Sequence, residues 1–303
     1  MSPTTDAIDS VLLPTDGSDG ALVGAKRGID LATTADAIVH VLSVVDTSEA
    51  DAVSSVLERE DTEQRATVEA EAETAVDAVA SLARDRDAEL EVTTATERGT
   101  AFRVIDRYVD ENGIDAVAMG TKGLTGLRRV VLGSVAENVL RTVGVPILVA
   151  PPDAEDTALT EETVENVLVP TDGSRGAAAA VDWGITLADA FDAMVHALYS
   201  VDTSRYPDRM EPDEVLTTLD QPGRGALEMV RERATEYGVS VTGTVATGPP
   251  ARIILDYADD EIDFVVIGTH GRSGLERHLL GSVTENVVRN ADVPVFCVPM
   301  DGD

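Results

Sequence analysis

The stretch that decides the fold is Val11-Leu-Leu-Pro-Thr-Asp-Gly-Ser18, a short apolar run that ends in a turn. It returns as Val167-Leu-Val-Pro-Thr-Asp-Gly-Ser174, with seven of eight residues identical. A second stretch, Leu132-Gly-Ser-Val-Ala-Glu-Asn-Val-Leu-Arg141, returns at residues 280–289 with eight of ten identical. The offset between the copies falls from 156 residues (167 minus 11) to 148 (280 minus 132). The chain is therefore an internal repeat whose second copy is shorter in its middle.

The length of the chain fits this repeat. Its 303 residues suffice for two domains of about 150, an ordinary domain size. Residues 151–164 are led by two prolines, acidic and without sustained periodicity, which is typical of a linker. We place the first domain at residues 1–152, the linker at 153–164 and the second domain at 165–303.

Each copy alternates apolar strand-like runs with helix-like stretches. In the first copy we expect strands at 10–13, 38–45, 90–96, 114–119 and 145–149, and helices at 19–33, 51–86, 101–111 and 134–141. The second copy follows the same order, with strands at 166–169, 194–201, 239–246, 262–267 and 293–298. Strands joined by helices imply right-handed crossovers and a parallel sheet. The predicted fold class is α/β, with two tandem doubly wound, Rossmann-like domains of five strands each.

Charge and cysteine content limit the functions. The formal net charge is −33, from 56 acidic and 23 basic residues spread along the chain, which favours a folded protein from a halophile, where salt screens the self-repulsion. The same charge argues against nucleic-acid binding. Cys297 is the only cysteine, so an internal disulfide and a cysteine-based zinc site are excluded. With no signal-like leader and no long apolar span, we expect a cytoplasmic protein with no membrane partner.

The most distinctive residues follow the fourth strand of each copy. The first copy has Gly120-Thr-Lys-Gly123, nine residues, then Gly133-Ser134, and the second has Gly268-Thr-His-Gly271, nine residues, then Gly281-Ser282. Glycines let consecutive backbone amides approach phosphate oxygens. Because the last glycine precedes a helix, the helix start also favours an anion there. The pattern predicts a phosphate cradle.

A structural interpretation of this motif stays open beside the functional one. Ser134 with Glu137, and Ser282 with Glu285, fit a capping box in which the serine satisfies helix amides. Neither loop is a Walker A sequence, so amides, a metal ion or nearby cationic side chains would have to neutralise a phosphate. The candidates for that last role are Arg128, Arg129, Arg272, Arg277 and His278. The alternative is that these side chains are loop charges that contact only solvent.

An aspartate follows the first strand of each copy. Asp16 and Asp172 stand in Pro-Thr-Asp-Gly-Ser, at the carboxyl end of a strand where ligands of doubly wound sheets bind. Their carboxylates suit ribose hydroxyls or a magnesium shell. A turn or helix cap is the alternative, because Gly17 and Gly173 follow directly. The repetition at a strand end favours function.

At these residues the sequence resembles the universal stress protein family in its tandem form. The family's ATP-binding signature is Gly, two residues, Gly, nine residues, Gly, then Ser or Thr, and both copies fit without a gap. The resemblance implies a Rossmann-like fold of the adenine nucleotide alpha hydrolase type that holds ATP, with or without magnesium. It also implies that the last strands, 145–149 and 293–298, pair within the chain as a pseudo-dimer, and that homodimers can form.

The resemblance also implies which residues contact the nucleotide. In the first copy they are Pro14, Thr15 and Asp16 on the adenosine side, Val44 for adenine through its backbone, and, around ribose and phosphates, Gly120, Gly123, Gly133, Ser134 and Val135. The matching set in the second copy is Pro170, Thr171, Asp172, Ser200, Gly268, Gly271, Gly281, Ser282 and Val283. Ser200 replaces the usual apolar residue of the adenine strand.

No residue stands out as catalytic. His270 has Lys122 as its counterpart, and His40 and His196 lie in strand-like runs, so we name neither a shared general base nor a metal-ligating set. The first hypothesis is an ATP-binding stress-response regulator with little or no turnover and unknown protein partners. The alternatives are a slow ATPase or phosphotransfer enzyme, and an interaction module that does not need ATP.

Overall fold

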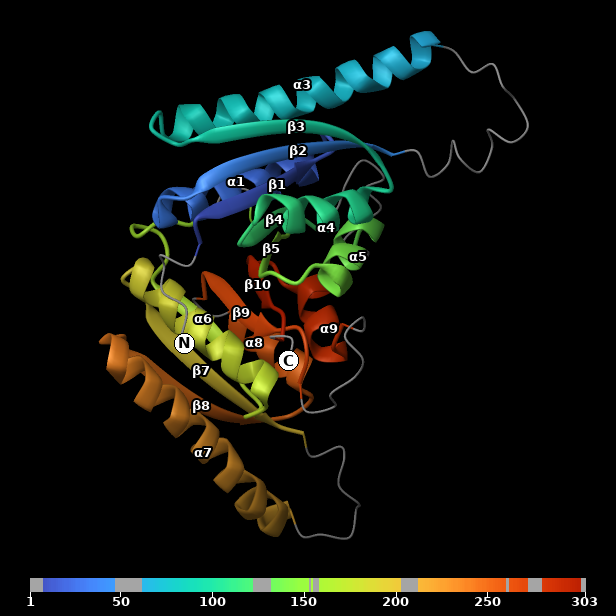
Figure 1. Cartoon of the computed structure of the whole chain (residues 1–303). Helices are drawn as coiled ribbons and strands as arrows, with labels where there is room; N and C mark the ends of the chain where they lie inside the picture. Colours follow the sequence, from blue (N-terminus) through green and yellow to red (C-terminus); the bar gives the residue numbers. More distant parts are fainter. Residues whose placement is uncertain are drawn as a thin grey trace, which may run out of the picture. The chain divides into compact units, whose positions relative to one another are not determined.

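The chain divides into two compact units, one of residues 8–152 and one built on residues 153–303, called domain 1 and domain 2 below (Figure 1). This computed structural model describes residues 8–46, 62–121, 132–152, 154, 158–202, 212–259, 262–271 and 280–300. The extent of the linker and the pairing of the last strands stay predictions.

Domain 1 contains five parallel strands in the order β3-β2-β1-β4-β5. Its elements are β1 (Ser10–Thr15), α1 (Asp19–Ala35), β2 (Ile38–Asp46), α3 (Thr62–Arg86), β3 (Val92–Gly99), α4 (Ala101–Asn112), β4 (Ala116–Gly120), α5 (Ser134–Thr142) and β5 (Ile147–Ala150). The helix expected over 51–86 is seen from Thr62, and residues 51–61 lie outside the described part of the chain.

Domain 2 repeats this topology, with the order β8-β7-β6-β9-β10 and parallel pairing. Its elements are β6 (Asn166–Pro170), α6 (Arg175–Ala190), β7 (Met194–Val201), α7 (Pro212–Tyr237), β8 (Val241–Thr247), α8 (Pro250–Ala258), β9 (Phe264–Gly268), α9 (Ser282–Asn290) and β10 (Val295–Val298). The predicted fold class is confirmed in both domains.

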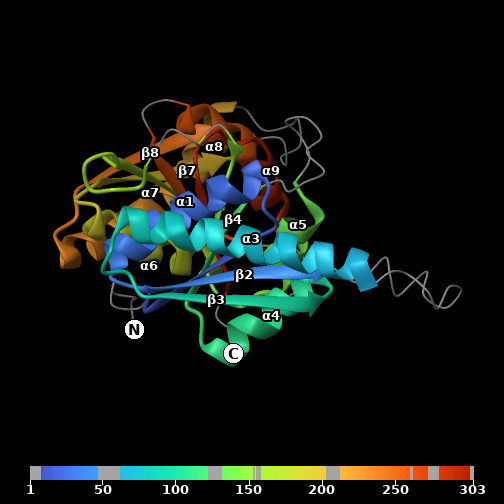
Figure 2. The same ribbon diagram turned by 90° about the horizontal axis from the view of Figure 1, so that it is seen from above.

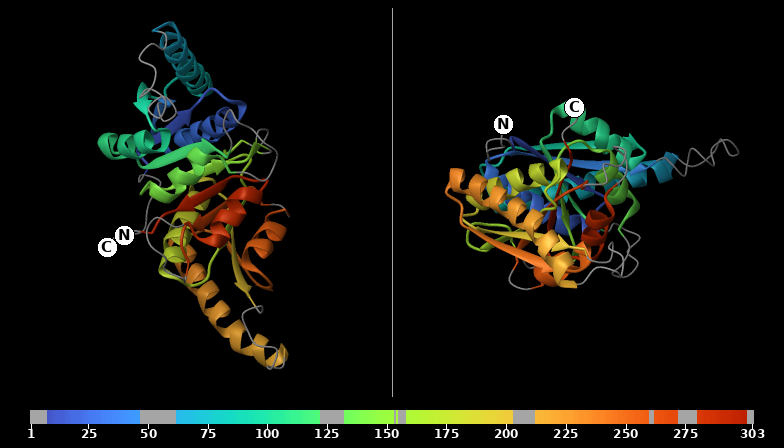
Figure 3. Two further views of the ribbon diagram at one scale, coloured as in Figure 1. Left: turned by 90° about the vertical axis from the view of Figure 1, so that its right-hand side faces the viewer. Right: turned by 90° about the horizontal axis from the view of Figure 1, so that it is seen from below.

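The burial of each strand follows from its place in the sheet. All six residues of β1 are buried, because helices cover both faces of a central parallel strand. In domain 1, α1 packs beside α3, and α4 packs beside α5. The long helix α3 runs along β2 and β3 (Figure 2), and α7 runs likewise along β7 and β8 (orange in Figure 3). None of the described helices is long and apolar enough to cross a membrane.

Two glycine contacts bring the first helix of each domain against the fourth strand. A Cβ atom on Gly24 would lie 2.1 Å from the backbone nitrogen of Gly120, and one on Gly268 would lie 2.7 Å from the carbonyl oxygen of Gly176. Real Cβ atoms essentially never come this close, so side chains are excluded at these contacts. The first glycine of each motif therefore has a packing role whether or not a ligand binds.

Candidate functional site

The strand order places one switch point in each domain. β1 lies between β2 and β4, and β6 lies between β7 and β9, so the connections after these neighbouring strands leave in opposite directions. Ligands of doubly wound sheets bind at this switch point, beyond the carboxyl ends of the strands. The Pro-Thr-Asp-Gly-Ser turn and the glycine motif both start at this edge.

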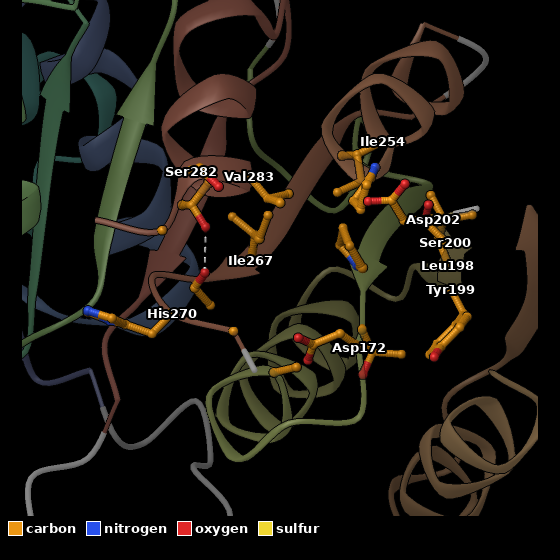
Figure 4. A pocket seen from close by; sticks show the side chains of 18 of the residues that line it. Asp172, Leu198, Tyr199, Ser200, Asp202, Ile254, Ile267, His270, Ser282 and Val283 are labelled. Atoms are coloured by element: carbon orange, nitrogen blue, oxygen red, sulfur yellow. Dashed lines mark hydrogen bonds between the residues drawn. The ribbon is translucent and has the colours of Figure 1, made fainter. Parts of the chain in front are cut away.

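Domain 2 has a pocket of about 300 Å³ at its switch point (Figure 4). This volume lies at the lower end of the range for small-molecule sites. All nine residues predicted for the second copy line the pocket. They come from the end of β6 and the turn after it, from β7, from the end of β9 and the loop after it, and from the start of α9: Pro170, Thr171, Asp172, Ser200, Gly268, Gly271, Gly281, Ser282 and Val283.

The turn after β6 holds Asp172 against the pocket. Its Oδ1 accepts a hydrogen bond of 2.9 Å from the amide of Ser174, and Gly173 adopts a φ of +75° that favours glycine. A Cβ on Gly271 would lie 2.9 Å from Oδ2 of Asp172, so this carboxylate faces the glycine motif. Asp172 therefore both stabilises the turn and lines the pocket.

The glycine motif is anchored where the helix begins. The amide of Gly281 donates to the carbonyl oxygen of Thr269 over 2.8 Å, and the amide of Gly133 does the same to Thr121 over 2.8 Å. Gly281 caps α9 with φ −61° and ψ 138°. Ser282 is exposed and Val283 half-buried in the first turn, where the helix start favours a negatively charged group.

The capping-box interpretation is wrong. The N-caps of α5 and α9 are Gly133 and Gly281, and the serines are the first helical residues. The carboxylates that would complete the boxes instead form ion pairs one turn on, Glu137 with Arg141 at 2.8 Å and Glu285 with Arg289 at 2.9 Å. The serines therefore do not serve as caps.

In domain 1 the matching residues occupy matching elements. Asp16 accepts a 3.0 Å hydrogen bond from the amide of Ser18, and Gly17 has a φ of +77°. The other predicted residues lie in β1, β2, β4 and the start of α5: Pro14, Thr15, Val44, Gly120, Gly133, Ser134 and Val135. Gly123 lies outside the described residues, as do Lys122, Arg128, Arg129, Arg272, Arg277 and His278.

Sequence reasoning missed part of the pocket lining. Leu198, Ile254 and Ile267 contribute apolar surface. The other unpredicted lining residues are Ala177, Tyr199, Val201, Asp202, Pro250, His270 and Thr284. A signal for Asp202 exists, because Val45-Asp-Thr-Ser48 recurs as Val201-Asp-Thr-Ser204, directly after the second strand of each copy.

The described histidines do not point into the pocket. Figure 4 shows the side chain of His270 directed away from the other labelled residues, and its Nδ1 lies 3.0 Å from the hydroxyl of Thr269. His40 and His196 pair instead with Tyr108 and Tyr257, each through Nδ1 at 3.1 Å from the phenol oxygen. Burial lowers the pKa of His40, as expected for an interior imidazole.

The charge of the pocket is negative in its described lining. Asp172 and Asp202 contribute carboxylates, and no lysine or arginine is among the lining residues of the described chain. The described residues also contain no group of three His, Cys, Asp or Glu side chains placed to hold a metal ion. An anionic ligand here would depend on backbone amides and the helix start.

Comparison with known proteins matches both domains to one family. The model of the universal stress protein family matches residues 7–151 and 163–299. Universal stress protein MJ0531 of Methanocaldococcus jannaschii is 38% identical over 142 residues, which are 46% of this chain and 84% of that protein.

Two solved structures extend the comparison. The crystal structure of a universal stress protein from Archaeoglobus fulgidus covers 99% of both chains with a TM-score of 0.72 and 19% identity, a likeness of fold alone. A universal stress protein family protein of Arabidopsis thaliana, solved with AMP bound, is 20% identical and covers 46% of this chain and 94% of its own, with a TM-score of 0.36.

Proposed function

The chain belongs to the universal stress protein family, and from this premise we propose that it is an ATP-binding regulatory protein with little or no turnover. Each domain binds one adenine nucleotide at its switch point. The bound nucleotide bridges the turn and the glycine motif, and so changes the surface that the domain presents to protein partners.

One observation carries the proposal: the domain 2 pocket gathers three motifs that are far apart in the sequence. Asp172, Ser200 and Ser282 stand more than 25 residues from one another, yet they line the same cavity. Their backbones are set by strand ends and a helix start rather than by long loops. This convergence is what a preformed ligand site requires.

We assign the two ends of the nucleotide by the chemistry of the walls. The phosphates lie at Gly281, Ser282 and Val283, because the amides of Ser282 and Val283 in the first turn of α9 are donors suited to a negative group. The amide of Gly281 is already bonded to Thr269, so Gly281 contributes close backbone approach. The adenosine lies at the other end, where Leu198 and Ile254 are apolar and Asp172 is a suitable acceptor for ribose hydroxyls. In domain 1 the counterparts Gly133, Ser134 and Val135 take the phosphate role.

The side chains that line the described pocket support the proposal of low turnover. Hydrolysis requires a group that activates or positions water beside the terminal phosphate. The ring of His270 points away (Figure 4), and Asp172 is engaged by the turn. The described lining therefore favours binding over catalysis.

Magnesium fits this site as a companion of the phosphates. The pocket offers the carboxylates Asp172 and Asp202 but no three-residue metal group among the described residues. Magnesium typically binds through one or two carboxylates together with substrate phosphates. When bound, it would neutralise phosphate charge, and Asp172, whose Oδ2 faces the glycine motif, would hold it.

The acidic charge supports a working environment of concentrated salt. A net charge of −33 on 303 residues opposes compaction unless ions screen it, and screening lengths fall to about 3 Å at 1 M salt. We therefore propose a halophilic protein.

The test is to identify and then displace the ligand. Protein purified in about 2 M potassium chloride should release an adenine nucleotide that mass spectrometry identifies, and the stripped protein should bind ATP in isothermal titration calorimetry. Ser282→Glu places a negative charge where the phosphates lie, at a helix position that favours acidic residues. We expect it to remove binding at domain 2, and Ser134→Glu to remove it at domain 1.

A matched control separates local repulsion from added charge. Asn286 is exposed on the same helix, about one turn further from its start, so Asn286→Glu should leave binding intact. Absence of ATP binding by the unmodified protein would overturn the proposal. Sustained phosphate release that is lost in Asp16→Ala with Asp172→Ala would favour the ATPase alternative, and partner capture unaffected by Ser134→Glu and Ser282→Glu would favour the ATP-independent one.

A further inference from the structure

The two copies differ at two positions that fix the walls of the pocket. We infer that the two nucleotide sites are not equivalent, and that domain 2 binds the nucleotide more tightly because Thr284 and Ser200 tie its pocket walls together. This inference rests on the proposed function. It assigns positioning roles to two side chains whose counterparts in domain 1 are Ala136 and Val44.

Thr284 joins the two ends of the glycine motif. Its side chain is 3% exposed, and its hydroxyl donates a 2.7 Å hydrogen bond to the carbonyl oxygen of Gly268, the dashed line in Figure 4. Gly268 is the last residue of β9, and Thr284 lies in the first turn of α9. The bond therefore holds the helix start, which carries the phosphate-facing amides, against the strand end.

Domain 1 has the same backbone arrangement without this side-chain bond. The amides of Gly133 and Gly281 make the same 2.8 Å hydrogen bond to Thr121 and Thr269. Ala136, at the position of Thr284, has only a methyl group, which cannot donate a hydrogen bond. The difference thus lies in the side chain and not in the path of the chain.

Ser200 provides the second tie, at the adenosine end. Its hydroxyl donates a 2.7 Å hydrogen bond to the carbonyl oxygen of Gly248, which follows β8. The matching glycine of domain 1, Gly99, has a similar φ of +144° against +150° for Gly248. Val44 cannot form the bond, because its side chain is a hydrocarbon.

These ties act by preorganisation. A wall that is already held in place loses less conformational freedom when a ligand binds, so the same contacts give higher affinity. Because both hydroxyls already donate to backbone carbonyls, they position the walls rather than contact the nucleotide. The ordering cost that one pre-fixed side chain spares on binding is equivalent to a factor of roughly 2 to 10 in affinity, so we expect domain 2 to bind ATP about tenfold more tightly than domain 1.

The test measures each site alone in the full chain. Ser134→Glu leaves only the domain 2 site, and Ser282→Glu leaves only the domain 1 site, for calorimetric titration with ATP. In the first background, Ser200→Val with Thr284→Ala should weaken binding about tenfold, to the level of domain 1. In the second, Val44→Ser with Ala136→Thr should tighten binding by a similar factor.

Two further measurements separate positioning from stability. Thr284→Ser keeps the hydroxyl and should restore most of the affinity that Thr284→Ala loses, which a purely steric role would not allow. Urea denaturation without nucleotide records the stability of each variant. Unchanged affinity at domain 2 in a destabilised Ser200→Val, Thr284→Ala variant would overturn the inference.

Failure of this inference is distinguishable from failure of the proposed function. If ATP binds with equal affinity to the two sites and the substitutions have no effect, only the non-equivalence is refuted. If ATP binds neither site of the unmodified protein, the proposed function itself is refuted.

Discussion

The amide of Gly281 donates a hydrogen bond to the carbonyl oxygen of Thr269 over 2.8 Å. This bond joins the N-cap residue of α9 to the residue that follows β9, so the two ends of the glycine motif are held together. Domain 1 contains the same bond between Gly133 and Thr121. Because this bond fixes the start of the helix, the backbone amides there are already in place for an anion before it binds. The proposed site depends on this preorganisation.

The first prediction concerns the packing role of Gly268. Gly268→Ala should destabilise domain 2 by about 1–3 kcal/mol, because its Cβ would lie 2.7 Å from the backbone oxygen of Gly176 and overpacking at this level is costly. Urea denaturation followed by circular dichroism measures the loss.

Gly225→Ala is the matched control for this substitution. Gly225 is exposed in α7, and a Cβ there meets nothing within 4 Å, so alanine should stabilise the helix by up to about 1 kcal/mol. Equal effects of Gly268→Ala and Gly225→Ala would show that the close contact between α6 and β9 is wrong.

The contact between Gly268 and Gly176 shows how far the sequence predicts the site. The spacing of Gly120, Gly123 and Gly133 indicated a motif at the switch point, and the repeat indicated its doubling, because glycine spacing is visible in the sequence. That Gly120 and Gly268 are also needed for helix packing was not visible, since the helix that approaches them begins about 100 residues earlier.

Other features of the site depend on which of several partners a side chain pairs with, and the sequence does not resolve this. Ser134 and Glu137 have the spacing of a capping box, but Arg141 lies one turn beyond Glu137 and takes the carboxylate. The hydrogen bond from Thr284 to Gly268 spans 16 residues. Comparison of the two copies marks Thr284 as different from Ala136, yet only the structure shows which carbonyl its hydroxyl meets.

The second prediction concerns pH. Burial lowers the pKa of His40, with Glu91 opposing the shift, so the folded state favours neutral imidazole more than the unfolded chain does. Below the ordinary value near 6.5 the unfolded chain binds more protons, and stability falls as the pH decreases through 6.5 toward the lowered folded pKa. Above 6.5 this contribution is fully present.

His40→Gln should therefore reduce the loss of stability between about pH 7 and pH 5. Glutamine keeps a polar group beside the hydroxyl of Tyr108, which lies 3.1 Å from Nδ1 of His40, but it does not titrate. Urea midpoints at several pH values give the slope for each protein. Identical slopes for the variant and the unmodified protein would contradict a half-buried His40 that the folded state keeps neutral.

The third prediction concerns salt. With 56 acidic and 23 basic residues, neighbouring like charges each cost about 0.2–0.5 kcal/mol when unscreened. We expect the free energy of unfolding to rise by a few kcal/mol between about 0.1 M and 2 M potassium chloride as screening shortens. Thermal unfolding in sorbitol of matched osmolality is the control, and a similar gain there would point to solute exclusion instead of charge screening.

The last prediction uses Cys297 as a reporter of domain 2. The thiol is 0% exposed in β10, and burial raises its pKa well above the ordinary value, so both access and thiolate formation require the domain to open. A disulfide reagent should therefore label the native protein slowly and the urea-unfolded protein at once. Because Cys297 is the only cysteine, the signal has a single source.

ATP should slow this labelling if the opening that exposes Cys297 also releases the nucleotide. Binding to the closed form alone reduces the open population by the factor 1 + [ATP]/Kd, which is about 100-fold at 100 times Kd. Ser282→Glu should lose this protection, while Asn286→Glu and Ser134→Glu should keep it, because neither changes the domain 2 site. Labelling that ATP leaves unchanged, in a protein that calorimetry shows to bind ATP at domain 2, would mean that the site and the core around β10 open independently.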